Sequence, residues 1–236
     1  MKLKIERFID GKSYVQEYDI KYKEDETLLE LLDRIRDYKD RSLTYRSFCR
    51  SSICGTCAVV ANSKTVLACK TKVKDLIQSD TLVIEPVKRA KIIKDLVAEH
   101  SFIEEKIKKV HGWFVDEIDE TKENIQTPEE LKKYDKQTDC ILCGACYFEC
   151  EALDYESNFA GPFAFTKVFR FVFDGRDKMD NQERIEIAKE NMLYNCVSCQ
   201  KCALVCPKNI SSVMDIKMLQ NFDKNPPFSD NFNNFF

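Results

Sequence analysis

The chain has 236 residues, which is enough for one large domain or for two modest domains that each bury a core. Its 37 Lys and Arg residues nearly balance its 40 Asp and Glu residues, and the resulting net charge of −3 argues against a nucleic-acid-binding protein. Only six glycines are present, too far apart for a G-x-G-x-x-G or P-loop motif, so the chain lacks the usual means of binding the phosphates of NAD, FAD or ATP.

The first predicted element is a β-hairpin. Residues 2–9 and 13–20 alternate apolar and polar side chains, which is the pattern of strands with one buried face. Between them, Asp10-Gly11 supplies the positive φ angles that a tight turn needs. We therefore predict two antiparallel strands at the start of the chain.

A helix and a later strand follow the hairpin. Thr27 and Glu30 have the spacing of a capping box, in which each side chain accepts a hydrogen bond from the backbone N–H of the other. Apolar residues at helical spacing then predict a helix from about residue 28 to residue 38, packed on the hairpin. Residues 81–85, Thr-Leu-Val-Ile-Glu, have the composition of a strand.

The cysteines between this helix and this strand indicate a metal site. Their spacing, C-x4-C-x2-C with a distant fourth cysteine, is the plant-type [2Fe–2S] pattern, and the four residues are Cys49, Cys54, Cys57 and Cys69. Gly55 lets the loop backbone approach the cluster and point N–H groups at its sulfurs. The hairpin, helix, cluster loop and strand fit a β-grasp ferredoxin domain. A reactive or zinc-binding cysteine group is the alternative.

The second half of the chain has helical periodicity. Residues 90–110 are predicted to form a helix that bridges two domains. Thr127 and Glu130 form another capping box, with Pro128 at the first helical position. Further helices are expected at 162–173, at 181–194 with Asp180 as the cap, and at 211–221. The Pro- and Asn-rich end of the chain is expected to be a frayed terminus.

Two further cysteine runs have the spacing C-x2-C-x2-C-x3-C, and the second ends in Cys-Pro. Bacterial-type ferredoxins hold cubane clusters with such runs, and the fourth thiolate of each run ligates the other cluster. The predicted ligands of the first [4Fe–4S] cluster are Cys140, Cys143, Cys146 and Cys206, and those of the second are Cys150, Cys196, Cys199 and Cys202. Disulfides and structural zinc are the alternatives. Disulfides need an oxidising compartment, however, and zinc sites usually pair two C-x2-C knuckles or include His.

The order of these sites resembles the iron–sulfur subunit of the succinate dehydrogenase and fumarate reductase family, over about residues 3–222. Besides the cysteines, the resemblance rests on Thr27-Leu-Leu-Glu, Ile53-Cys-Gly-Thr-Cys, Ile93-Lys-Asp-Leu-Val and Arg170-Phe-Val-Phe-Asp-Gly-Arg-Asp. The cysteine patterns and this resemblance predict an α+β protein. It would have a β-grasp plant-type ferredoxin domain at residues 1–100 and an all-helical bacterial-ferredoxin-like domain at residues 101–236.

The resemblance also implies a role in electron transport. In that family a flavoprotein partner holds FAD and interconverts succinate and fumarate, a membrane-side partner exchanges electrons with quinone, and the iron–sulfur subunit conducts electrons between them. The [2Fe–2S] cluster would face the flavin, the Cys140 cluster would lie in the middle, and the Cys150 cluster would face the quinone end. This chain would then be a subunit of an oxidoreductase, with no catalysis expected from it alone.

Three departures from the family pattern fall at the quinone end. Most members have a non-cysteine residue at the position of Cys199 and hold a [3Fe–4S] cluster, whereas the fourth thiolate here predicts [4Fe–4S]. A three-iron cluster beside an unliganded Cys199 is the alternative. Glu151 follows Cys150 where the family has Pro and then Trp, and Val197 stands where many members have His. These features resemble the unusual branch whose membrane-side partner is a cysteine-rich, heterodisulfide-reductase-like subunit.

The expected location is a peripheral membrane complex. No stretch has the roughly 18 to 20 apolar residues of a membrane-spanning helix, and the N-terminus lacks the apolar core of a secretory signal. We expect the cytoplasmic side by default, or the periplasmic side if a signal-bearing flavoprotein carries the chain across. Three other functions stay open: the iron–sulfur subunit of another flavin-dependent dehydrogenase, a free polyferredoxin carrier, and a zinc-stabilised interaction module.

Overall fold

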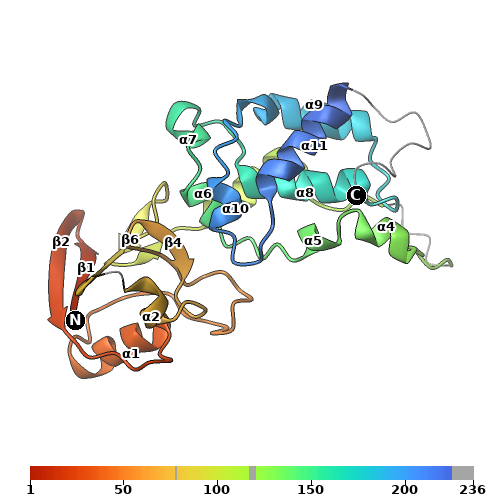
Figure 1. The fold of residues 1–236 in the computed structure, drawn as a ribbon. Coiled ribbons are helices and arrows are strands. Elements are labelled where there is room, and N and C mark those ends of the chain that lie inside the picture. Colours follow the sequence, from red (N-terminus) through yellow and green to blue (C-terminus); the bar gives the residue numbers. More distant parts are fainter. Residues whose placement is uncertain (78, 117–120, 225–236) are drawn as a thin grey trace. The chain divides into compact units, whose positions relative to one another are not determined.

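The computed structural model describes residues 1–77, 79–116 and 121–224 (Figure 1). The chain forms two compact units. Unit 1 comprises Met1–Phe102 and Ile141–Glu149, and unit 2 comprises Ile103–Cys140 and Cys150–Phe236. The cysteine run at 140–150 therefore contributes residues to both units. The predicted boundary between the two ferredoxin-like domains, between residues 100 and 101, stays a prediction.

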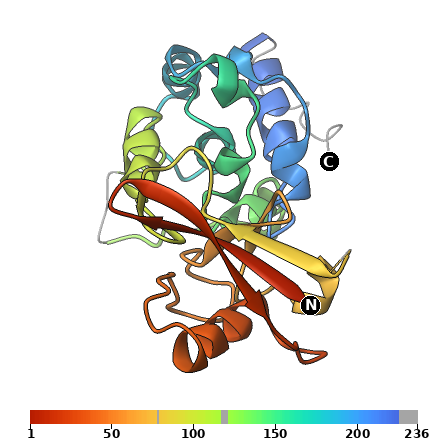
Figure 2. The ribbon, with the colours of Figure 1, turned by 90° about the vertical axis from the view of Figure 1, so that its left-hand side faces the viewer.

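Unit 1 is built on a five-stranded sheet. Its strands are β1 (Lys2–Ile9), β2 (Lys12–Asp19), β3 (Ala58–Ala61), β4 (Lys64–Leu67) and β5 (Thr81–Glu85), in the order β2-β1-β5-β3-β4. Strand β1 is parallel to β5, while the other neighbours are antiparallel, and Figure 2 shows β1 beside β5. The predicted N-terminal hairpin is confirmed, with Asp10 at φ 51° and Gly11 at φ 78° in its turn.

Helix α1 (Leu28–Tyr38) supplies much of the core of unit 1. Its four leucines and Ile35 are buried. The predicted capping box is present: the Glu30 N–H donates to Thr27 Oγ1 at 3.2 Å, and the Thr27 N–H donates to the Glu30 carboxylate at 2.7 Å. The Leu29 N–H donates to the carbonyl of Ala68 at 2.9 Å, which ties the start of α1 to the chain beside Cys69. A short helix, α2 (Val73–Leu76), follows.

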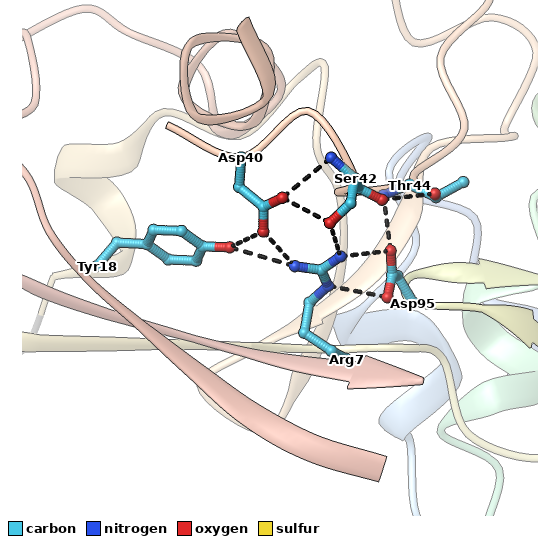
Figure 3. Close-up of polar contacts among 6 residues, drawn as sticks. All are labelled: Arg7, Tyr18, Asp40, Ser42, Thr44 and Asp95. Atoms are coloured by element: carbon cyan, nitrogen blue, oxygen red, sulfur yellow. Dashed lines mark hydrogen bonds and ion pairs between the residues drawn. The ribbon is translucent and has the colours of Figure 1, made fainter. Parts of the chain in front are cut away.

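The helix predicted for residues 90–110 is wrong in its first half. That half contains the short strands β6 (Ile92–Lys94) and β7 (Val97–Ala98), and helix α3 runs only from Ser101 to Lys109. The cause is Asp95, which has a left-handed φ of 45° and a buried carboxylate that accepts hydrogen bonds from Arg7 at 2.8 and 3.1 Å (Figure 3). Because this contact joins residues 88 apart in the chain, local periodicity could not reveal it.

Unit 2 is helical among its described residues. Its helices are α4 (Pro128–Lys132), α5 (Asp135–Thr138), α7 (Ala152–Tyr155), α8 (Pro162–Phe173), α9 (Asn181–Glu190), η1 (Leu193–Asn195), α10 (Lys201–Leu204) and α11 (Ser212–Lys224), while α6 (Ala145–Phe148) belongs to unit 1. Helix α8 has ten buried residues out of twelve and packs against α11 and α9. The core of unit 2 therefore lies around α8.

The predicted helices of unit 2 are confirmed with shifted ends. Helix α8 has the predicted bounds, and Asp180 caps α9 by accepting from the Glu183 N–H at 3.0 Å. Helix α9 ends at Glu190, because Met192 takes a left-handed φ of 69° before a turn of 3-10 helix. The frayed terminus predicted for the end of the chain lies outside the described residues. The α+β class is confirmed.

Candidate iron–sulfur cluster sites

The loop from Cys49 to Cys57 has a backbone shaped by left-handed residues. Arg50, Ser52 and Gly55 have φ angles of 57°, 56° and 72°. Such angles cost a non-glycine residue about 1 kcal/mol or more and persist where the surrounding structure or a bound group compensates. Alternation of right- and left-handed residues turns successive N–H groups toward one point, which makes a concavity suited to anionic groups.

The N–H groups of this loop point at cysteine sulfurs. The Cys49 Sγ accepts from three of them, those of Ser51, Cys54 and Ile53, at 3.5, 3.2 and 3.3 Å. These bonds lower the pKa of the Cys49 thiol to about 6, which favours the thiolate, the form in which cysteine binds metal. The Ser52 N–H donates to Cys69 Sγ at 3.2 Å.

The β3–β4 hairpin brings the other cysteines to the same place. Cys57 directly precedes β3 and Cys69 follows β4, and the Ala68 N–H donates to the Cys57 carbonyl at 3.0 Å. Burial raises the pKa of the Cys57 thiol to about 12, so iron must displace a proton from this sulfur when it binds. The four cysteines of the plant-type pattern are thus linked to one another through this loop and hairpin.

Gly55 is confined by a second cysteine run as well as by its φ angle. A Cβ atom at this position would lie 2.7 Å from both the Cα and the Cβ of Cys143. Real Cβ atoms do not approach other atoms so closely, so only glycine fits without displacing the backbone of Cys143. The reason for Gly55 is therefore a close approach inside unit 1, in addition to the approach to a cluster that the sequence suggested.

A carboxylate on α1 anchors the start of the cluster loop. Asp33 accepts hydrogen bonds from the Tyr45 hydroxyl and from the Arg50 guanidinium. Arg50 is the residue after Cys49, so this contact fixes the loop where it leaves its first cysteine. No local sequence pattern marks Asp33 for this role, because it lies on the half-buried side of an ordinary amphipathic helix.

A buried arginine anchors the chain just before the cluster loop. Arg7 has no exposed surface, and its guanidinium pairs with Asp40 at 2.5 Å and with Asp95 at 2.8 Å (Figure 3). It also donates to Ser42 Oγ at 3.0 Å, and the Thr44 N–H donates to Asp95 at 2.8 Å. One feature of the sequence indicates this network: Arg7 lies on the same face of the first strand as Leu3 and Ile5, which are buried.

The two cubane-type runs share one backbone conformation. In the first, Leu142 and Gly144 have left-handed φ angles of 53° and 77°, and in the second Ser198 and Gln200 have 56° and 64°. These residues flank the second of the four cysteines in each run, and a short helix follows at the same offset, α6 in the first run and α10 in the second. The sequence repeat is therefore also a structural repeat.

Four cysteines of unit 2 line one cavity. They are Cys150, Cys196, Cys199 and Cys202, together with apolar side chains that include Pro162 and Val213. Burial raises the pKa of Cys150 to about 11 and that of Cys202 to about 12, whereas Cys199 is exposed. These are the four residues predicted to hold the second cubane cluster, and a sulfur-lined, largely apolar cavity suits such a cluster.

The ligand set predicted for the first cubane cluster is divided by the chain's two units. Cys143 and Cys146 lie in unit 1, and Cys140 and Cys206 lie in unit 2. The Ile210 N–H donates to Cys206 Sγ at 3.3 Å, and Lys167 Nζ donates to the Cys140 carbonyl at 3.4 Å. The set of four remains a sequence prediction.

Two kinds of site are absent from the described part of the chain. Among residues 1–77, 79–116 and 121–224, no three His, Cys, Asp or Glu side chains are grouped to hold a single metal ion. None of the helices in those same ranges is both long and apolar enough to cross a membrane. The twelve cysteines are thiols and not disulfides.

Both halves of the chain match known domain families. Residues 2–105 match a 2Fe-2S iron-sulfur cluster binding domain, and residues 136–210 match a 4Fe-4S dicluster domain. The chain therefore has domains for both kinds of cluster, and the expected cofactor types are confirmed. The assignment of individual cysteines to clusters stays a prediction.

Known proteins of similar sequence are components of reductases. The 8-methylmenaquinol:fumarate reductase iron-sulfur subunit of Wolinella succinogenes is 38% identical over 230 residues, covering 93% of this chain and 72% of that protein. One subunit of the fumarate reductase (CoM/CoB) of Methanothermobacter marburgensis is 35% identical over 89% of this chain, which spans 40% of that protein. A chain of the Mycobacterium smegmatis Sdh1 complex in the apo form has the same fold, with a TM-score of 0.86 at 21% identity over 95% of both chains.

Three observations support the same family. They are the order of a [2Fe–2S] domain and a dicluster domain, the cysteine geometry in each unit, and the extent of these matches. This chain belongs to the family of fumarate reductase and succinate dehydrogenase iron–sulfur subunits.

Proposed function

We propose that this chain is the electron-transfer subunit of a quinone-linked fumarate reductase or succinate dehydrogenase complex. The observation that carries the proposal is the pair of preformed sulfur sites: the Cys49 loop with its inward N–H groups, and the cavity lined by four cysteines in unit 2. Iron–sulfur clusters pass single electrons, and their potentials depend on hydrogen bonds to sulfur, on charge and on exposure. A protein with several such sites is suited to conduct electrons.

We further propose which residues hold each cluster. The [2Fe–2S] cluster would take Cys49, Cys54, Cys57 and Cys69; the first [4Fe–4S] cluster would take Cys140, Cys143, Cys146 and Cys206; the second would take Cys150, Cys196, Cys199 and Cys202. When bound, the clusters supply one-electron redox chemistry. The chain itself supplies thiolates, N–H groups that stabilise their charge, and apolar walls that restrict water.

The proposed partners are an FAD-containing flavoprotein, where succinate and fumarate would be interconverted, and a membrane-side subunit. The name of the Wolinella relative couples a quinol to fumarate, which supports electron flow of this type. The fourth thiolate at Cys199, together with Val197 two residues before it and Glu151 directly after Cys150, supports a cysteine-rich, heterodisulfide-reductase-like membrane-side partner. The complex would be peripheral to the membrane, on the cytoplasmic side unless the flavoprotein is exported.

Anaerobic purification of the tagged chain from its native cells tests this proposal. We expect a flavin-containing protein to co-purify in near-equal amount, and a brown preparation with iron, acid-labile sulfide and signals of both cluster types on reduction. A colourless protein containing zinc would overturn the electron-transfer role. A cluster-loaded chain that associates with no flavoprotein would instead indicate a free polyferredoxin carrier.

A second candidate stays within the same architecture. The relative from Methanothermobacter marburgensis is part of a fumarate reductase named for CoM/CoB and not for a quinol. Its 35% identity over most of this chain supports an iron–sulfur subunit of a different complex. That complex would take electrons from another donor, or would contain another flavin-dependent dehydrogenase. Identifying the co-purifying subunits, and assaying the complex with a quinol and with thiol donors, separates the two candidates.

A further inference from the structure

A small polar cluster lies inside the apolar core of unit 2. At its centre is Asp215 on α11, which is only 2% exposed. Its carboxylate accepts a hydrogen bond from Thr166 Oγ1 on α8 at 2.7 Å and another from Gln137 Nε2 on α5 at 2.7 Å. The hydroxyls of Thr166 and Ser212 are 2.9 Å apart. A buried carboxylate held by two neutral groups is rare, since a buried charge is normally paired.

The charged groups on the elements around Asp215 make contacts elsewhere, although the buried Nε of Arg170 has no hydrogen-bond partner. On α8, Lys167 donates to the Cys140 carbonyl and Arg170 lies over the Phe171 ring. On α9, Arg184 pairs with Asp177 and Lys189 pairs with Glu186. On the shorter helices, Lys136 (α5) pairs with Asp139, Lys201 (α10) pairs with Glu151, and the Tyr194 hydroxyl (η1) donates to Asp223. Asp135 on α5 and Lys217 on α11 are exposed.

Burial raises the pKa of Asp215 to about 6, although the hydrogen bonds from Thr166 and Gln137 act in the opposite direction. The carboxylate and the carboxylic acid are therefore both accessible near neutral pH. A modest change in the local electrostatic field is enough to move a group of this kind from one form to the other.

The polar cluster adjoins the sulfur-lined cavity along two helices. Val213, two residues before Asp215 on α11, lines the cavity, and its N–H donates to the Cys202 sulfur. Pro162 also lines the cavity and lies four residues before Thr166 on α8, which is about one helical turn or roughly 5 Å. Asp215, Thr166 and Val213 are all buried, so a charge on Asp215 is weakly screened by water.

We infer that Asp215 is a proton-binding site whose occupancy is coupled to reduction of the second cubane cluster. This inference rests on the proposed function, in which a partner subunit supplies the electron: the reduced flavin during succinate oxidation, or the membrane-side subunit during fumarate reduction. When the cluster accepts one electron it gains one negative charge, and the Asp215 carboxylate takes one proton from water to become the neutral acid. When the electron leaves, the proton is released. The net charge of the cluster and the carboxyl together is unchanged.

Redox titration of the cluster-loaded complex at a series of pH values tests the coupling. The second cluster is followed by low-temperature EPR under anaerobic conditions, from about pH 5 to pH 9. A tenfold change in proton activity corresponds to about 59 mV for one electron, so we expect the midpoint potential to fall by up to about 59 mV per pH unit across a window near neutrality. The [2Fe–2S] cluster in unit 1 is the internal reference in the same samples, and its potential should be nearly flat in that window.

Three variants make the test specific to this residue. Asp215→Asn keeps the shape and both hydrogen-bonding neighbours but cannot ionise, and it should abolish the slope. Asp223→Asn removes a carboxylate from the same helix two turns farther on, and it should retain the slope. Thr166→Val removes a hydrogen bond that lowers the pKa of Asp215, and it should move the sloping window to higher pH.

The outcomes separate this inference from the proposed function. A normal cluster signal whose potential does not depend on pH, or a slope that survives in Asp215→Asn, overturns the proton site and leaves electron transfer intact. If Asp215→Asn fails to assemble, the direction of the shift in Thr166→Val decides: no shift overturns the coupling. The absence of any cubane signal in the wild-type complex would overturn the proposed function and the coupling together.

Discussion

We expect Cys199 to decide which cluster the four-cysteine cavity of unit 2 holds. It is the exposed member of the four cysteines that line the cavity, and it stands at C-x2-C spacing between Cys196 and Cys202. With four thiolates every iron of a cubane has a protein ligand, and the whole chain should carry about ten irons. We expect Cys199→Ala to carry about nine irons and to show the signal of an oxidised [3Fe–4S] cluster in EPR.

The matched control for this change is Val197→Ala, in the same loop, which removes an exposed side chain and leaves all four thiols. Its iron content and spectrum should equal those of the wild type. The potential of the altered cluster should rise in Cys199→Ala, because an anionic thiolate is lost. A stoichiometric three-iron signal in wild-type protein kept free of air would contradict the assignment of Cys199 as a ligand.

Gly55 and Gly11 provide a comparison between two kinds of glycine. Both have φ angles in the left-handed region, but a Cβ at Gly11 meets nothing within 4 Å, whereas one at Gly55 would lie 2.7 Å from Cys143. Gly11→Ala should cost about 1 kcal/mol, the penalty for a left-handed alanine. Gly55→Ala must also displace backbone, so we expect a larger loss of stability together with loss of the [2Fe–2S] absorption in visible spectra. Equal effects of the two substitutions would contradict the close packing at Cys143.

At the scale of elements, the Arg7 network joins three segments that no hydrogen bond of the sheet connects: the end of α1, the approach to the cluster loop, and the β6–β7 turn. Breaking a buried ion pair by removing one partner costs about 3 kcal/mol or more, since the other charge stays buried. For Asp95→Asn we expect the thermal midpoint of the cluster-loaded protein to fall by about 10 °C. Lys4→Gln, on the same strand, breaks an exposed pair with Glu17 and should change it little.

The same network predicts a pH dependence of stability. Burial opposes ionisation of Asp40, but hydrogen bonds from Ser42, Tyr18 and Arg7 outweigh it and hold the pKa of Asp40 below its ordinary value. A carboxyl whose pKa is lower in the folded state stabilises the fold above its unfolded pKa of about 4, and this stabilisation is lost as the pH falls. The difference in thermal midpoint between wild type and Asp40→Asn should therefore stay nearly constant from about pH 7 to about pH 5 and shrink as the pH is lowered further, below about 4. A difference independent of pH would contradict it.

The elements that were predictable from sequence are those with local signals. The N-terminal hairpin has its Asp10-Gly11 turn, α1 has its capping box, and α8 has an apolar run that fills a core. The segment around Asp95 was mispredicted because its conformation depends on Arg7, far away in the chain. Likewise, cysteine spacing indicated the cluster types, but the contact of Gly55 with Cys143 and the isolation of Asp215 follow from folding. Contacts between residues far apart in the chain produce no periodic pattern in the sequence.

At the scale of the whole molecule, the two units place their cysteine sulfurs in different electrostatic environments. Unit 1 directs loop N–H groups at Cys49, and these hydrogen bonds lower the pKa of its thiol. Unit 2 surrounds Cys150 and Cys202 with apolar side chains, and burial raises the pKa of both thiols. Hydrogen bonds to sulfur raise a cluster's potential, whereas an additional thiolate such as Cys199 adds negative charge and lowers it. We therefore expect the [2Fe–2S] cluster and the second cubane to differ in potential.

A chain that only conducts electrons should be inactive when it is alone. We expect the purified, cluster-loaded chain to show no fumarate reduction with a reduced artificial donor and no succinate oxidation with an artificial acceptor. Activity that links fumarate to a quinol should appear only when the flavoprotein and the membrane-side subunit are both present. The clusters must then carry every electron between the two partners.

The control is a complex whose chain carries Cys49→Ser, which removes the thiolate that accepts three N–H bonds in the [2Fe–2S] loop. The flavoprotein in that complex should still reduce fumarate with a small artificial donor that reaches the flavin directly, whereas quinol-linked activity should fall at least tenfold. Loss of both activities would indicate failed assembly, which gel filtration of the complex detects. Turnover of fumarate by the isolated chain after removal of all flavin would contradict this division of roles, because the catalysis would then have to take place on this chain.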